Sequence, residues 1–136
     1  MWIRSAVRVA LLTVALIVLL VGCSDNRTAE VVGTVSVDGQ PVEKGSISFI
    51  PADGKGVTAG SDIKDGKYVA TGVSPGTAKV EIRVPKVTGK KMLYDDKNVT
   101  RDTFSESLPK KYNVDTELRF DVQPGKNEKN WDVSTK

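Results

Sequence analysis

The chain of 136 residues contains no histidine and a single cysteine, Cys23. Without histidine it cannot build a Ser-His-Asp or Cys-His catalytic mechanism, nor a zinc site that uses histidine ligands. With one cysteine it cannot form an internal disulfide. Phosphate-binding loops and dinucleotide-binding glycine motifs are also missing. These absences exclude most of the common enzyme and cofactor chemistries.

Carboxylates are the remaining residues that could support catalysis or bind a metal. Asp95 and Asp96 are adjacent, so on an extended chain they point to opposite sides and are expected to be a solvated charge pair. Asp62 and Asp65 could attract calcium, but the alternating acidic pattern of a calcium loop is missing, and Asp65-Gly66 is more typical of a turn. We therefore predict no enzymatic activity, no metal and no cofactor; a small envelope hydrolase remains the least favoured alternative.

The longest apolar run is short and lies at the N-terminus. Val9 to Val21 is apolar apart from Thr13, and Arg4 and Arg8 precede it. The run has 13 residues, whereas a membrane-spanning helix needs about 20. A basic start followed by a short apolar run is typical of a cleaved export signal.

The end of this run resembles the lipobox of bacterial lipoproteins. Leu20-Val21-Gly22-Cys23 has an apolar residue three positions before the cysteine and a small residue directly before it. The resemblance implies cleavage between Gly22 and Cys23 and lipid attachment to the Cys23 thiol. Residues 1–22 are then a helical signal peptide, and residues 23–30 are a lipidated tether.

Cleavage of the export signal lowers the net charge of the remaining chain, and export determines where the protein is expected to be located. Removing the signal removes Arg4 and Arg8, so 18 of the 20 basic residues remain against 17 acidic ones. This balance gives no reason to expect nucleic-acid binding. We expect the protein to be exported and lipid-anchored in the cell envelope. Ser24 stands where an aspartate would signal inner-membrane retention, so the resemblance to sorted lipoproteins implies the outer membrane.

After the tether, apolar and polar residues alternate with a period of two. Ala78, Val80, Ile82 and Val84 alternate with polar residues, and Asp-Gly pairs mark hairpin turns. No later window has a convincing helical period. Residues 31–136 are therefore predicted to form an all-β, antiparallel, seven-stranded β-sandwich of the prealbumin or immunoglobulin kind. The predicted strands cover residues 31–37, 46–50, 57–62, 67–71, 78–84, 117–122 and 130–134.

Residues 86–116 do not follow this pattern and are interpreted as an insertion, with one helical turn near residues 103–108. The segment is long, charged and weakly periodic, and structureless loops of this length are often functional. It contains the aromatic residues Tyr94, Phe104 and Tyr112, which could bind a partner or, alternatively, pack the loop onto its own domain.

Residues 32–84 resemble the carboxypeptidase regulatory-like domain, which has a transthyretin (prealbumin) type of fold. The resemblance is carried by five segments with matching order and spacing: Gly33-Thr34-Val35-Ser36-Val37-Asp38-Gly39-Gln40-Pro41-Val42, Gly45-Ser46-Ile47-Ser48-Phe49, Asp62, Asp65-Gly66-Lys67-Tyr68 and Gly72-Val73-Ser74-Pro75-Gly76. The chain is especially similar to short bacterial lipoproteins that consist of a signal and one such domain.

The resemblance implies a fold and a location but no reaction. We expect a non-enzymatic, lipid-anchored β-sandwich of the cell envelope that acts as an interaction or structural module. Its partners would be the membrane, through the N-terminal lipid, and an envelope protein or glycan. The main alternative is a carbohydrate-binding envelope module that uses residues 86–116.

Overall fold

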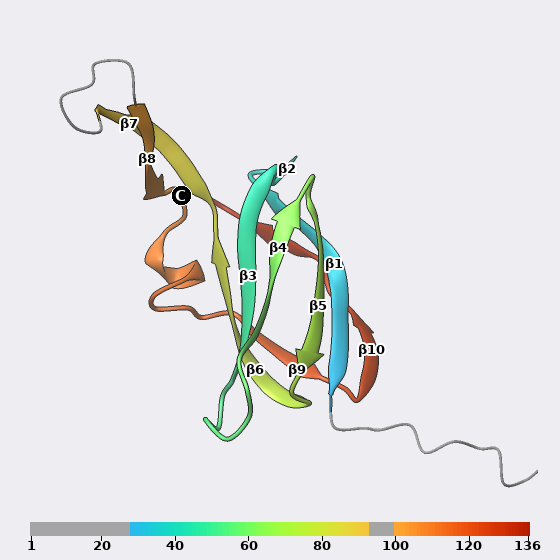
Figure 1. The fold of residues 1–136 in the computed structure, drawn as a ribbon. Coiled ribbons are helices and arrows are strands. Elements are labelled where there is room, and N and C mark those ends of the chain that lie inside the picture. The colour runs from blue at the N-terminus through green and yellow to red at the C-terminus, as the bar shows by residue number, and fades with distance from the viewer. Residues whose placement is uncertain (1–27, 93–99) are drawn as a thin grey trace, which may run out of the picture.

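The computed structural model describes residues 28–92 and 100–136, and this part of the chain is all-β (Figure 1). The predicted signal helix, Gly22, Cys23 and Tyr94 lie outside the described residues. One short 3₁₀ turn, η2 (Lys110–Tyr112), accompanies the strands. The strands are β1 (Ala29–Val37), β2 (Gln40–Pro41), β3 (Lys44–Pro51), β4 (Ala59–Lys64), β5 (Lys67–Val73), β6 (Gly76–Arg83), β7 (Pro85–Met92), β8 (Thr100–Glu106), β9 (Arg119–Val122), β10 (Gly125–Glu128) and β11 (Trp131–Val133).

All seven predicted strand segments are strands in the structure, as β1, β3, β4, β5, β6, β9 and β11. The number seven is wrong, because β2, β7, β8 and β10 bring the strands in the described residues to eleven. The sheet is mainly antiparallel, as predicted, but two of its pairings are parallel. β1 pairs in parallel with both β10 and β11, while its pairing with β5 is antiparallel.

The main sheet curls back on itself. Its strands follow the order β10-β1-β5-β4-β3-β6-β9, with β2 and β11 also paired to β1. The two ends of this path, β9 and β10, are consecutive in the chain and separated only by residues 123–124. In addition, β4 and β5 are paired only at Lys64 and Lys67, which flank the Asp65-Gly66 turn. The sheet therefore bends at this hairpin, and its apolar residues gather inside.

The alternating residues fill the core as the pattern predicts. Val31, Ile47, Val80 and Ile82 are completely buried. Burial of such side chains stabilises the folded state by about 1.5–3 kcal/mol each. Phe120, which the alternation also directs inward, is only partly buried and packs against the core from the sheet edge.

Gly33, one of the residues in the resemblance, lies under a tight crossing of the chain. A Cβ atom at this position would lie 1.8 Å from the carbonyl oxygen of Lys129. The Lys129 backbone is held there because its N–H donates to the Val32 carbonyl (2.9 Å) and its carbonyl accepts from the Tyr68 hydroxyl (2.7 Å). Only glycine fits beneath this crossing, between the segments of β1 that pair with β10 and β11.

The proposed insertion is more regular than its sequence indicates. Strands β7 and β8 form a separate two-stranded antiparallel sheet that extends from the end of β6 (Figure 1). The helical turn expected near residues 103–108 is wrong, since β8 continues to Glu106 and the only helical turn described nearby is η2. A hairpin with both faces in water has no apolar alternation, so periodicity alone does not reveal it.

No helix in the described ranges is both long enough and apolar enough to cross a membrane.

Candidate functional site

The hairpin formed by β7 and β8 contributes no described side chain to the hydrophobic core. Its register runs from Pro85 opposite Glu106 to Met92 opposite Thr100, with a bulge between Val87 and Gly89. All described side chains of β7 from Pro85 to Lys91 are exposed, and in β8 only Thr103 is half-buried. An isolated two-stranded hairpin is marginally stable in water. Its order therefore depends on its root, by which we mean Val84 and residues 106–108, where the hairpin joins the body.

A single carboxylate organises the root. Glu106 Oε1 accepts hydrogen bonds from the backbone N–H groups of Val84 (3.0 Å), Ser107 (3.0 Å) and Leu108 (3.1 Å). The Ser107 N–H and hydroxyl both donate to the Val84 carbonyl. Leu108 is buried in the core directly after these contacts. The hairpin is thereby fixed to the body although its own faces contribute no core.

The register separates the hairpin into two chemically different faces. Residues directly opposite each other in an antiparallel pair share a face. One face therefore carries Lys86, Lys91 and Arg101, and Lys91 lies directly opposite Arg101. No carboxylate occurs on this face within the described strands. We call it the cationic face.

The other face, which we call the apolar face, combines a hydrophobic pair with balanced charge. Val87 lies directly opposite Phe104, and their side chains are 51% and 61% exposed. Lys90 lies opposite Asp102 on the same face. Large apolar side chains that remain this exposed on neighbouring strands are typical of binding surfaces.

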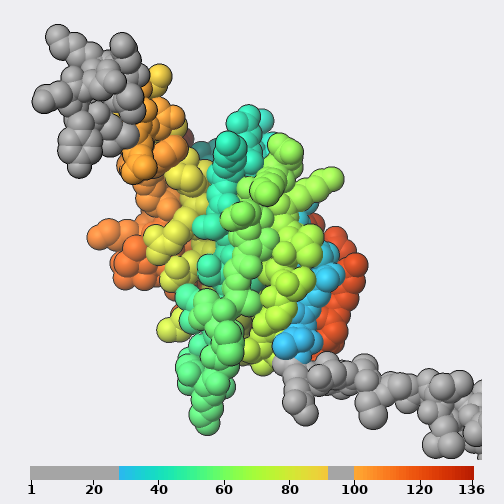
Figure 2. Space-filling model, viewed as in Figure 1, coloured from blue at the N-terminus to red at the C-terminus, as the bar shows by residue number. Residues whose placement is uncertain are grey.

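A hollow of about 500 Å³ lies between the apolar face and the start of β3. We call it the root groove; its lining includes Lys44 from β3, Pro85 and Val87 from β7, and Asp102 and Phe104 from β8. It combines apolar walls with a few charged groups, as small-ligand sites do. The space-filling view shows residues 100–106, in orange, extending beyond the cyan and green strands (Figure 2).

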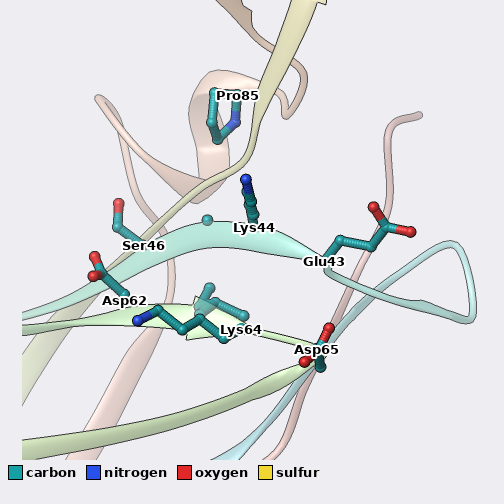
Figure 3. A pocket seen from close by; sticks show the side chains of 9 residues that line it. Glu43, Lys44, Ser46, Asp62, Lys64, Asp65 and Pro85 are labelled. Carbon is teal, nitrogen blue, oxygen red and sulfur yellow. The ribbon is translucent and has the colours of Figure 1, made fainter.

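A second hollow of about 520 Å³ continues from the root groove along the ends of β3 and β4 (Figure 3). The two hollows share Glu43, Lys44 and Pro85. In Figure 3 the side chain of Lys44 extends toward Pro85. Asp62 and Asp65, the residues considered above for calcium, both line this hollow. The described residues contain no group of three acidic, cysteine or histidine side chains placed to hold a metal ion.

The aromatic residues predicted to bind a partner have different surroundings. Phe104 is exposed at the root groove. Tyr112 packs against the core from η2, and its hydroxyl accepts a hydrogen bond from the Ser134 N–H (3.3 Å). Tyr112 therefore helps to pack η2 onto the domain, and it does not line the root groove with Phe104. Tyr94 lies outside the described residues.

Sequence reasoning missed Val87 and Glu106 as parts of the site. The signal for Val87 is its cross-strand position opposite Phe104, which depends on a register shifted by a bulge. The role of Glu106 depends on three N–H groups at the junction of two strands and a loop. Neither feature has a local sequence pattern.

Among the residues that the structure describes, two groups have clearly shifted pKa values, and both are structural. Burial raises the pKa of Tyr68 to about 12, against a smaller lowering contribution from the neighbouring Trp131 indole. Within the described residues, the buried indole N–H has no hydrogen-bond partner. Hydrogen bonds from the side chains of Thr135 and Ser134 hold the pKa of Asp38 below its usual value, which ties the C-terminal residues to the β1–β2 turn.

The hairpin lies at the opposite end of the body from the start of β1. Ala29 pairs with Val73, which immediately precedes the turn into β6, whereas the hairpin leaves from the other end of β6 after Arg83. Eight residues of strand span about 26 Å. Figure 1 shows the two sites at opposite ends of the molecule.

Comparisons with known proteins do not indicate a family or a function for this chain. No protein-family model matches the sequence, and no curated protein matches it. Among solved structures, the chain is similar to part of a 9R-lipoxygenase from Cyanothece PCC8801, with 10% identity over 79% of this chain and a TM-score of 0.34. The chain spans only 16% of the length of that lipoxygenase. At this level the likeness supports no argument about function.

Proposed function

We propose that this chain is a non-enzymatic, lipid-anchored binding module of the bacterial cell envelope, and that the β7–β8 hairpin with its root groove is the recognition element. One observation carries the proposal. An ordered hairpin exposes both faces, including the Val87–Phe104 pair, at the end of the body farthest from Ala29. A lipid on Cys23 would hold the other end at a membrane, so the hairpin would point away from it.

The proposal includes a β-sandwich of the prealbumin type for the body. Two features support this arrangement. The first and last strands of the sheet path are consecutive in the chain, so the path folds back over itself. The pairing between β4 and β5 is limited to Lys64 and Lys67, which allows β10-β1-β5 and β4-β3-β6-β9 to act as two facing layers.

Lipid attachment is tested by labelling cells with radioactive palmitate. The wild-type protein should incorporate label, and the Cys23→Ser variant should not, because a hydroxyl does not replace the thiol in lipid transfer. Density-gradient separation of the membranes then tests the outer-membrane location, which the Ser24 position supports. Equal labelling of both proteins contradicts the anchor.

Recognition by the hairpin is tested by site-specific photo-crosslinking in intact cells. A photo-reactive phenylalanine analogue replaces Phe104 in one version and Val69, an exposed residue of β5 that is 56% accessible, in the matched control. We expect a discrete crosslinked product from position 104 and none from position 69. Crosslinks only from position 69, or from neither, contradict the assignment of the hairpin.

A second version of the proposal, carbohydrate binding, is favoured by the placement of Phe104. Its exposed ring lines the root groove beside Lys44 and Asp102, an arrangement in which a sugar ring could stack and form polar contacts. A glycan array probed with wild-type protein and a Phe104→Ala variant separates the two versions. Binding to sugars that the variant loses supports the carbohydrate version.

A further inference from the structure

The outer edge of β8 is the most open strand edge of the hairpin. In the described part of the chain, β8 pairs with β7 and with no other strand. At another strand edge of the sheet, by contrast, a loop covers the exposed backbone groups. Just before β9 begins alongside β6, the Val80 N–H donates to the Leu118 carbonyl and the Thr116 hydroxyl donates to the Val80 carbonyl, so a loop covers that edge. No comparable contact covers β8 within the described residues.

The two edges of the hairpin differ in how well they could accept another strand. β7 begins with Pro85, contains a bulge next to Gly89 and carries three lysines, which are all features that discourage edge pairing. β8 has the sequence Thr-Arg-Asp-Thr-Phe-Ser-Glu, with no proline, no glycine and no extra residue in its register. Its threonines and phenylalanine favour extended structure.

We infer that β8 accepts an extended segment of a partner protein as an added strand, and that this segment alternates acidic with apolar residues. The inference rests on the proposed function, because it specifies the partner of the same hairpin. A strand added beside β8 would place its side chains alternately on the two faces. Acidic residues would lie beside Arg101 on the cationic face, and apolar residues would lie beside Phe104 on the apolar face.

The charge arrangement supports the acidic half of this pattern. Lys91 lies directly opposite Arg101 across the strands, and like charges in this relation destabilise a pair. An acidic residue on the next strand would relieve that repulsion at Arg101. The apolar half follows from Phe104, whose 61% exposed ring would be covered by a valine or isoleucine on the added strand.

The test uses full-length protein in detergent and blocked ten-residue peptides whose binding is followed by fluorescence anisotropy. A peptide in which glutamate alternates with valine should bind, whereas one in which lysine alternates with valine should not. The Lys91→Glu/Arg101→Glu variant should weaken binding of the glutamate peptide by about tenfold and bind the lysine peptide instead. The Lys67→Glu/Lys79→Glu variant, which changes the same charge on the exposed surface of the body, should behave as wild type.

Backbone pairing is tested from the peptide side, which avoids any effect on folding of the protein. In a strand, the N–H groups of alternate residues point to opposite edges. Methylating the backbone nitrogens of the glutamates blocks one edge, and methylating those of the valines blocks the other. Binding should be lost with one set only. Equal behaviour of the two sets overturns the inference.

Two further outcomes would overturn it. One is failure of the glutamate peptide to bind the wild-type protein. The other is a dimer of the protein in the absence of peptide, abolished by Lys91→Glu/Arg101→Glu, which would assign the edge to a second copy of the chain. If crosslinks from position 104 persist in cells while the glutamate peptide does not bind, the proposed function stands and only the strand-addition inference fails.

Discussion

The body and the β7–β8 hairpin are built from the same kind of strand but are stabilised in different ways. In the body, apolar side chains at alternate positions are buried completely, as Ile47 and Val80 show. In the hairpin, the apolar pair Val87 and Phe104 remains more than half exposed. The body is therefore held by what its strands bury, whereas the hairpin is held by hydrogen bonds at its root. The exposed side chains of the hairpin are consequently not required for packing of the core.

The largest difference between the two regions should come from adding one methyl group to a glycine. Gly33→Ala in the body would place a Cβ atom against the Lys129 carbonyl, so the crossing chain must move. We expect a loss of about 3 kcal/mol or more in the free energy of unfolding. In the hairpin, the Gly89→Ala methyl would meet only the Thr103 hydroxyl at an ordinary 3.4 Å, and we expect little change.

Urea unfolding of the full-length protein in detergent measures both glycine variants. A Gly33→Ala variant as stable as Gly89→Ala would show that the crossing at Lys129 is not rigid.

The chain has three phenylalanines, and they form a graded series across the two regions. Phe49 is 1% exposed in the core, Phe120 is partly buried at the sheet edge, and Phe104 is 61% exposed on the hairpin. Substitution by alanine should cost about 3–5 kcal/mol at Phe49. The cost should be within about 0.5 kcal/mol at Phe104, with Phe120 between them. Any other order in urea melts contradicts the burial of these rings.

The contrast between the regions also explains what the sequence could predict. The strands of the body were predictable because burial imposes alternation, as in Ala78 to Val84. The parallel pairing of β1 with β10 was not, because it depends on where a distant segment returns. The hairpin buries no face, so its residues carry no period. Of the predicted aromatic site, Phe104 is at an exposed surface, whereas Tyr112 depends on a contact with Ser134, 22 residues away, that no local pattern reveals.

Alkaline pH should weaken the body through Tyr68. Its pKa is raised to about 12 in the folded protein, whereas an unfolded tyrosine has a pKa near 10. The unfolded state therefore loses this proton first, so the stabilisation is complete below pH 10 and is lost as the pH rises toward 12. Urea midpoints measured from pH 9 to pH 11.5 should fall. In Tyr68→Phe the fall should be shallower, and identical slopes contradict the assignment.

Loss of the contacts at the root of the hairpin should change local opening of the chain much more than global stability. Glu106→Ala removes the acceptor for the N–H groups of Val84, Ser107 and Leu108. Hydrogen exchange followed by NMR should become faster at these amides, while the free energy of unfolding changes by about 1 kcal/mol. Asp102→Ala, also on β8, is the matched control and should leave exchange at the root unchanged. Faster exchange throughout the body in Glu106→Ala would mean that the hairpin is part of the cooperative core.

The position of the hairpin has a mechanical consequence. If a membrane holds the chain before Ala29 while a partner pulls on β8, the force acts along the length of β1 and β6. β1 is bonded to β5 on one side and to β10 and β11 on the other. The load would then be shared by many hydrogen bonds sheared together, instead of opening them one after another. Such a module could transmit tension between a membrane and its partner without unfolding first.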